Sequence, residues 1–129
     1  MRAALLLVCL VACNDKPKVQ LVASSCADFA SCSAECDRHI VVACDRGSMK
    51  APDAQSKMTI NRKGYEMWAR TCDFGMPEAC LNATYSSLRS RGQEPLSMSR
   101  PQIIADKEAC EYFEIYSRAS GTPLAGKCP

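Results

Sequence analysis

Apolar side chains recur at intervals of three and four residues along most of this chain, which is the spacing of amphipathic helices. The first such stripe predicts a helix over residues 26–45, which Gly47 is expected to end. Its members are Phe29, Cys32, Cys36 and Ile40. A second stripe predicts a helix from Pro52 to Cys72, interrupted by Gly64. No segment shows the two-residue alternation of a half-buried strand, so the pattern predicts an all-α fold.

Two further helices are predicted in the second half of the chain. One spans residues 77–91 and ends at Gly92, and the other begins at Pro101. The apolar face of the latter comprises Ala105, Ala109, Tyr112, Phe113 and Tyr116. Residues 120–129 are rich in glycine and proline and are expected to form a closing loop. The two halves resemble copies of one hairpin, since a glycine follows Cys36 and Cys80 at similar distances. We therefore expect two stacked helical hairpins with a repeat of about 45 residues.

The N-terminus has a different pattern. Arg2 is followed by about ten apolar residues, and ten helical residues reach only about 15 Å, half of a bilayer core. This is typical of a secretory signal rather than of a transmembrane helix. The run Leu10-Val11-Ala12-Cys13 resembles the lipobox of bacterial lipoproteins. The alternative is an ordinary signal peptide that contains a cysteine by chance.

The lipobox resemblance implies removal of residues 1–12 and attachment of a diacylglyceryl group to the thiol of Cys13. The new amine would then accept an acyl chain such as palmitate. Such a lipoprotein would be anchored at the periplasmic face or outer surface of a membrane in the bacterial cell envelope. Residues 13–25 would be the lipidated cysteine and a polar tether, and residues 26–129 the folded domain.

Cysteine usage agrees with export. The chain has 10 cysteines in 129 residues; Cys9 would leave with the signal and Cys13 would carry lipid. The remaining eight are Cys26, Cys32, Cys36, Cys44, Cys72, Cys80, Cys110 and Cys128. An even number of cysteines in an exported chain predicts up to four disulfides.

Residues 68–82 resemble the cysteine-rich members of the Sel-like helical repeats, which are relatives of tetratricopeptide repeats. The segment has an aromatic residue, a cysteine, a glycine turn and an Ala-Cys start, in the order Trp68, Cys72, Gly75 and Ala79-Cys80. The resemblance implies a helical repeat fold and a disulfide between Cys72 and Cys80. This chain departs from the family pattern in Ala83-Thr84, which lacks the usual glycine, and in Ser120, where the repeat would have cysteine.

The other cysteines present a conflict. In one straight helix, Cys26 and Cys32 would lie about 9 Å apart along the axis, and Cys36 and Cys44 about 12 Å apart. A disulfide needs Cα atoms within about 7 Å of each other. Either the helix is broken or displaced near residues 26–32, or some thiols stay reduced, or the family bridge is absent. We favour a break, with Cys26 on a segment that precedes the helix, and leave the connectivity of the other six cysteines open.

Several other residues could carry chemistry. A zinc site built from Cys26, Cys32, Cys36 and Cys44 would lack the short paired spacings of zinc ligands. His39 has no acidic or nucleophilic companion at fixed spacing and is expected on a helix surface. Tyr65 and Trp68 are expected in the core rather than along a ligand groove. We therefore expect no catalytic residue, no metal and no cofactor.

Net charge indicates which partners to expect. With 16 basic and 14 acidic residues the formal charge is only +2, so no nucleic-acid partner is expected. Arg89, Arg91 and Arg100 are expected to form a mildly basic, solvated turn.

The function expected from these features is a protein- or peptide-binding or structural module, since stacked repeat hairpins form concave binding surfaces. The alternative is an enzyme, because some cysteine-rich members of the resembled family have been assigned weak β-lactam binding or hydrolysis. The chain has no Ser-x-x-Lys pair, the nucleophile motif of serine β-lactamases. A non-enzymatic module is therefore the favoured interpretation.

Overall fold

The computed structural model describes residues 16–124 and 126–129. These residues form six α-helices and one short 3-10 helix, and the part of the chain described contains no strand beyond one isolated bridge. The helices are α2 (Phe29–Asp37), α3 (Val41–Lys50), α4 (Ala54–Asp73), α5 (Pro77–Arg89), η1 (Pro95–Ser97), α6 (Arg100–Ala105) and α7 (Lys107–Ala119). The predicted all-α fold is confirmed. The expected signal segment, with Cys9 and Cys13, lies outside the described residues.

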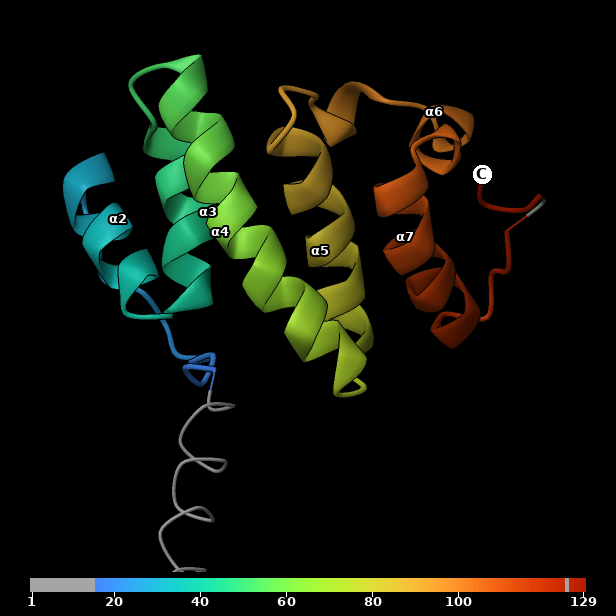
Figure 1. Ribbon diagram of the computed structural model, residues 1–129, viewed down its shortest axis with the longest axis horizontal. Coiled ribbons are helices and arrows are strands. Elements are labelled where there is room, and N and C mark those ends of the chain that lie inside the picture. Colours follow the sequence, from blue (N-terminus) through green and yellow to red (C-terminus); the bar gives the residue numbers. More distant parts are fainter. Residues whose placement is uncertain (1–15, 125) are drawn as a thin grey trace, which may run out of the picture.

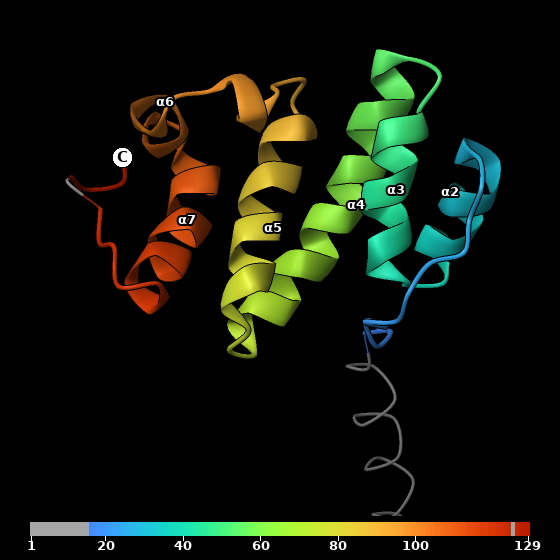
Figure 2. The same ribbon diagram turned by 180° about the vertical axis from the view of Figure 1, so that it is seen from behind.

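The helices stand side by side in chain order, so that α2 and α7 are at opposite ends of one row (Figure 1). The view from behind shows the same order (Figure 2). Helices α3 and α4 form one hairpin, α5 and α7 form the second, and α4 packs along α5 to join them. The predicted stack of two helical hairpins is therefore confirmed, with α2 as an additional helix at the start of the row.

Two of the predicted helices are each divided in two. The first ends at Asp37 and restarts at Val41, because His39 adopts the left-handed conformation with φ of 65°. The helix predicted to begin at Pro101 is divided at Asp106, which follows α6 and caps α7. Its carboxylate accepts a hydrogen bond from the backbone N–H of Ala109 at 3.0 Å. A capping carboxylate offers the backbone an alternative to continuing the helix, so the apolar stripe runs through a break that it does not reveal.

Gly47 was expected to end a helix, and this expectation is wrong. Gly47 lies inside α3, where a Cβ atom would come within 2.3 Å of Cδ1 of Ile60 and 3.1 Å of Cβ of Cys32. Gly64 lies inside α4, where a Cβ atom would be 3.1 Å from Cβ of Cys44. Both glycines thus allow close approach between helices rather than marking turns. Gly92, by contrast, follows the end of α5 in the left-handed region with φ of 79°.

Four disulfides link all eight cysteines of the described chain. The pairs are Cys26–Cys32, Cys36–Cys44, Cys72–Cys80 and Cys110–Cys128. The third is the pair that the family resemblance implied. Because the sulfurs of the first four cysteines are bonded to one another, they cannot form the zinc site considered above.

The conflict around the first four cysteines is resolved by two interruptions of the backbone. Cys26 precedes α2, as favoured, and its Cα atom lies 4.9 Å from that of Cys32. The second interruption, at His39, was not expected. It turns the chain back so that the Cα atoms of Cys36 and Cys44 also lie 4.9 Å apart.

The disulfides also correct the repeat. Cys36 and Cys44 recur 36 residues later as Cys72 and Cys80. The first cysteine of each pair is the last but one residue of its helix, and the second is the fourth residue of the next helix. The repeating unit is therefore 36 residues long and matches Cys36 with Cys72. The expected repeat of about 45 residues, which matched Cys36 with Cys80, is wrong because those two cysteines lie at opposite ends of their helices.

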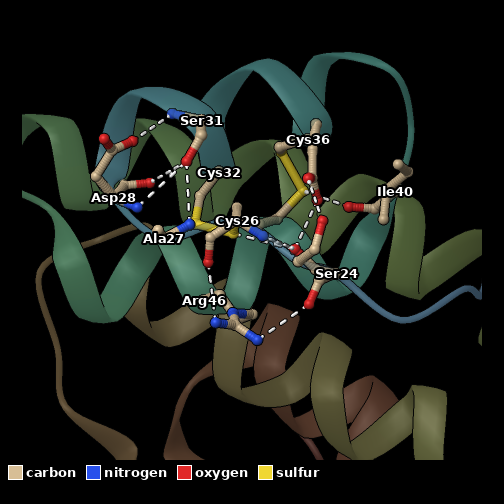
Figure 3. Close-up of a disulfide and its surroundings, with 12 residues drawn as sticks. Ser24, Cys26, Ala27, Asp28, Ser31, Cys32, Cys36, Ile40 and Arg46 are labelled. Atoms are coloured by element: carbon tan, nitrogen blue, oxygen red, sulfur yellow. Dashed lines mark hydrogen bonds between the residues drawn. A yellow bond between two sulfur atoms is a disulfide. The ribbon is translucent and has the colours of Figure 1, made fainter.

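The segment before α2 contacts the domain from Pro17 onward, where the guanidinium of Arg70 donates to the Pro17 carbonyl and Val19 packs against the core. The backbone N–H of Gln20 donates to the carbonyl of His39 at 2.8 Å, and the N–H of Val41 donates to the carbonyl of Gln20 at 3.4 Å. The guanidinium of Arg46 donates to the carbonyls of Ser24 and Cys26 at 3.0 and 2.9 Å (Figure 3). Of the tether expected over residues 13–25, the part from Pro17 onward is thus docked on the helices of the domain.

Candidate functional site

A shallow groove lies at the lower ends of the helices as drawn in Figure 1, between the start of the described chain and the turn that joins α4 to α5. Its volume is about 820 Å³. It is lined by residues 16–19, Leu21, Arg70, Thr71, Asp73, Phe74, Gly75 and Met76. We call this surface the α4–α5 groove. It is the candidate functional site of the described chain.

Both walls of the α4–α5 groove are held in place by the fold. Arg70, in the last turn of α4, donates a hydrogen bond to the carbonyl of Pro17 at 3.1 Å and so holds the N-terminal segment against the helix. Opposite it, Gly75 has φ of 97° and donates its N–H to the carbonyl of Cys72 at 2.9 Å. Because Cys72 is bonded to Cys80 across this turn, the turn is fixed on both sides.

The groove is apolar with a basic rim. Phe74 is 92% exposed, and Leu21 and Met76 are 48% and 40% exposed. The charged lining consists of Lys16, Lys18, Arg70 and Asp73, so cations outnumber carboxylates. Such a surface can bind apolar groups next to negative charge.

The groove does not contain the elements of nucleophilic catalysis. Its only hydroxyl belongs to Thr71, which donates to the carbonyl of Met67 at 2.9 Å within α4. Its carboxylate, Asp73, ends α4. A base hydrogen-bonded to a nucleophile, which a covalent mechanism needs, is therefore not formed by these side chains.

The residues singled out from the sequence lie elsewhere. Trp68 is buried in the core, as expected, and Tyr65 is half-buried, with its ring centroid 5.8 Å from that of Tyr112 in an edge-on arrangement. His39 is in the turn between α2 and α3 rather than on a helix surface, and its Nδ1 is buried without a hydrogen-bond partner. Neither aromatic residue lines the α4–α5 groove.

Of the three arginines expected in a solvated turn, Arg91 and Arg100 are exposed and Arg89 is half-buried, and all three also form contacts within the second hairpin. Arg89 forms an ion pair with Glu94 at 3.1 Å, and Arg91 pairs with Asp106. Arg100 donates to the carbonyl of Thr122 at 3.1 Å. These side chains connect the elements around η1 and α6, so the basic patch has a structural role.

Sequence reasoning missed Phe74 as a candidate. It lies within the segment that resembles a Sel-like repeat, and a phenylalanine near a helix end is usually expected in the core. Its exposure depends on the direction of the turn after α4, which Gly75 and the Cys72–Cys80 bond set. The neighbouring Gly75 was the only local signal of a turn at this point.

Metal binding finds no support in the described part of the chain. No group of three or more histidine, cysteine, aspartate or glutamate side chains there is arranged to hold a metal ion. Nor is any described helix both long enough and apolar enough to cross a bilayer.

Asp45 on α3 carries a largely buried carboxylate that lies beside the core tryptophan Trp68. Burial raises its pKa to about 6, although the indole N–H of Trp68 donates to both carboxylate oxygens at 3.2 and 3.1 Å and the charge of Arg89 acts in the opposite direction. Since Asp45 packs under a core tryptophan and does not line the groove, we assign it a structural role.

This buried carboxyl predicts a pH-dependent stability. Its pKa is about 6 in the folded chain against an ordinary value of 3.8, so folding penalises the ionised form. The penalty is fully present above pH 6 and is relieved as the pH falls towards 3.8. We expect the free energy of unfolding, from urea titrations, to be about 1 kcal/mol higher at pH 5 than at pH 7. In Asp45→Asn, whose amide oxygen can still accept from Trp68, this rise should disappear.

The control for this experiment is Asp37→Asn, since Asp37 is exposed and paired with Lys63. This variant should keep the rise. Measurements should stay at or above pH 5, because Glu94, Asp106 and Glu108 have lowered pKa values and lose their stabilising charge in more acidic solution. An equal rise in the wild type and in Asp45→Asn would contradict the assignment.

Comparison with known proteins found no matching family model, no similar curated protein and no similar solved structure for this chain.

Proposed function

We propose that this protein is a lipid-anchored, disulfide-stabilised helical repeat module of the bacterial cell envelope that binds a protein or peptide. The observation that carries the proposal is the complete pairing of the eight cysteines from Cys26 to Cys128. No described cysteine is left to pair with Cys13, which stands at the end of the lipobox-like run Leu10–Cys13. Disulfides persist in oxidising compartments outside the cytosol, which supports export.

A partner would bind most readily at the end of the helices away from the tether. Met49, in the last turn of α3, is 79% exposed, and Leu96, in η1, is 76% exposed. The α3–α4 connection and η1 lie at the upper ends of the helices, opposite to residues 16–18 and the α4–α5 turn at the lower ends (Figures 1 and 2). A domain tethered through Cys13 would therefore present these apolar residues away from the membrane.

The test of this proposal is the intact mass of the protein purified from bacterial membranes, before and after reduction with alkylation. We expect a chain that starts at Cys13 and carries two or three acyl chains, which together anchor stably because each buried methylene contributes about 0.8 kcal/mol. Alkylation should add eight groups only after reduction. The variant Cys13→Ser should keep residues 1–12 and carry no acyl group. An unacylated wild-type chain would contradict the lipid anchor.

The alternative implied by the family resemblance is β-lactam hydrolysis. It is tested by nitrocefin turnover of the full chain, with Cys72→Ser as the background control. Turnover above that background would support an enzyme in place of a binding module. We expect none, since the side chains of the α4–α5 groove do not pair a nucleophile with a base.

A further inference from the structure

Phe74 is the most exposed large apolar side chain of the described residues, and the fold holds it there. It is the C-cap residue that follows α4, its backbone N–H donates to the carbonyl of Arg70 at 3.2 Å, and it is 92% exposed. Met76, two residues on, is 40% exposed. The Cys72–Cys80 disulfide closes the turn and so holds the backbone that carries these two side chains. Neighbouring exposed apolar side chains that are rimmed by charged residues are a feature of interaction surfaces.

The start of the described chain lies on this same patch. Lys16, Pro17 and Lys18 line the groove together with Phe74 and Met76. Lys16 follows Cys13 by three positions along the chain, and three residues span at most about 11 Å even when fully extended. Acyl chains on Cys13 would therefore hold the groove close to the lipid headgroups.

The charges of the groove match an anionic surface. The lining of the groove contains three cationic side chains, Lys16, Lys18 and Arg70, and one carboxylate, that of Asp73. Basic residues next to an anionic bilayer are attracted by its surface potential, and apolar side chains among them enter the boundary between headgroups and acyl chains. The combination of an exposed aromatic ring with flanking cations fits a membrane better than it fits an acidic peptide, which would leave Phe74 exposed.

The rest of the molecule leaves this end free to approach a membrane. Residues 16–18 and the α4–α5 turn lie at the lower ends of the helices in both views, whereas the α3–α4 connection and η1 lie at the upper ends (Figures 1 and 2). A bilayer that meets the lower end would not contact the exposed apolar residues of the upper end.

We propose that the α4–α5 groove is a second membrane contact, in which Phe74 and Met76 insert into an anionic lipid surface while Lys16, Lys18 and Arg70 contact the headgroups. This inference rests on the proposed anchoring through Cys13. The acyl chains hold the protein on the membrane, and the groove sets its orientation, with the helix ends at η1 and the α3–α4 connection directed outward.

The test uses an introduced indole as a depth probe on the full-length, anchored protein. Phe74→Trp is compared with Leu96→Trp, a matched substitution of an exposed apolar residue at the opposite end. Each variant is reconstituted into vesicles of phosphatidylethanolamine and phosphatidylglycerol that contain a brominated phosphatidylcholine as quencher. Emission of the buried Trp68 is recorded on the unsubstituted protein and subtracted. We expect the emission added by Phe74→Trp to shift to shorter wavelength and to be quenched about twofold, since interfacial groups lie about 5–10 Å below the boundary.

The emission added by Leu96→Trp should neither shift nor be quenched. Replacing phosphatidylglycerol by phosphatidylcholine, or substituting both Lys16→Ser and Lys18→Ser, should weaken the quenching seen in Phe74→Trp. Equal quenching of the two introduced indoles, or an indole in Phe74→Trp that stays unquenched, would overturn the proposal.

The quenching result can be distinguished from the test of the lipid anchor, because acylation is measured by the intact mass of the same sample. If the mass shows no acyl group, the anchoring proposal fails. The depth measurement still applies, because Cys13→Ser retains the apolar residues 3–12 at the same point of the chain. Quenching of the introduced indole when Phe74→Trp is combined with Cys13→Ser would support the groove as a membrane contact on its own.

Discussion

Reduction of the four disulfides is expected to unfold this domain at 37 °C. The bonded cysteines are separated by 6, 8, 8 and 18 residues. Loops of this length restrict the unfolded chain by an amount worth about 2.5–3 kcal/mol per bridge. The four together contribute about 10 kcal/mol, which is comparable with the whole stability of a small domain, about 5–15 kcal/mol.

The position of the cysteines strengthens this expectation. Cys36, Cys44, Cys72 and Cys80 belong to the main core cluster, whose other members include several alanines. Small side chains bury little apolar surface, so this core cannot replace the restraint that the bridges supply. Loss of the disulfides would also free the turns that hold α2 to α3 and α4 to α5.

The measurement is far-ultraviolet circular dichroism at 37 °C before and after reduction with a phosphine, with alkylated samples used to count free thiols. The helical signal should be lost once all eight thiols are free. Cys110→Ser with Cys128→Ser is the control, because this bridge ties the closing loop to α7 and joins no pair of helices. That double variant should stay helical. A fully reduced chain with an unchanged helical signal would show that packing alone holds the fold.

The second large effect is expected from Leu88→Ala, on α5. Leu88 has no exposed surface and belongs to a cluster with Ile103 and Ala109, against which Met98 and Phe113 pack. Truncation of a buried leucine removes its transfer free energy and leaves a cavity, at a cost of about 2–5 kcal/mol. The packing of the second hairpin should be weakened most, since this cluster joins α5 to α6 and α7.

Leu96→Ala provides the matched control, because Leu96 is the same residue type and is 76% exposed. The free energy of unfolding of the Leu96→Ala variant should differ from that of the wild type by no more than about 0.5 kcal/mol. Both variants are compared by urea denaturation with the disulfides intact. If Leu88→Ala lowered the free energy of unfolding by no more than Leu96→Ala does, the cluster around α5 would contribute little to stability.

Sequence patterns predicted some features of the α4–α5 groove and not others. The segment from Trp68 to Asn82 was informative about the fold, since it pointed to a helix end, a glycine turn and a bonded cysteine pair. The same segment did not predict that Phe74 is exposed. It also did not predict that Lys16 lies beside Phe74, because those two residues are far apart along the chain. The docking of the N-terminal segment on the helices, through Arg70 on Pro17 and Val19 on the core, brings them to one surface.

By itself, the sequence determined that the domain is helical, where the Gly92 turn falls, and that its cysteines suit disulfides. These features are local, because an apolar stripe or a turn glycine acts on residues within a few positions of it. The tertiary structure alone decided that the chain breaks at His39, that Gly47 lies inside a helix, and that the six other cysteines pair as they do. Each of these depends on what a neighbouring helix or segment places against the residue: Ile60 against Gly47, Gln20 against His39, the start of α3 against the end of α2 for Cys36–Cys44, and a non-helical segment against a helix for the other two pairs.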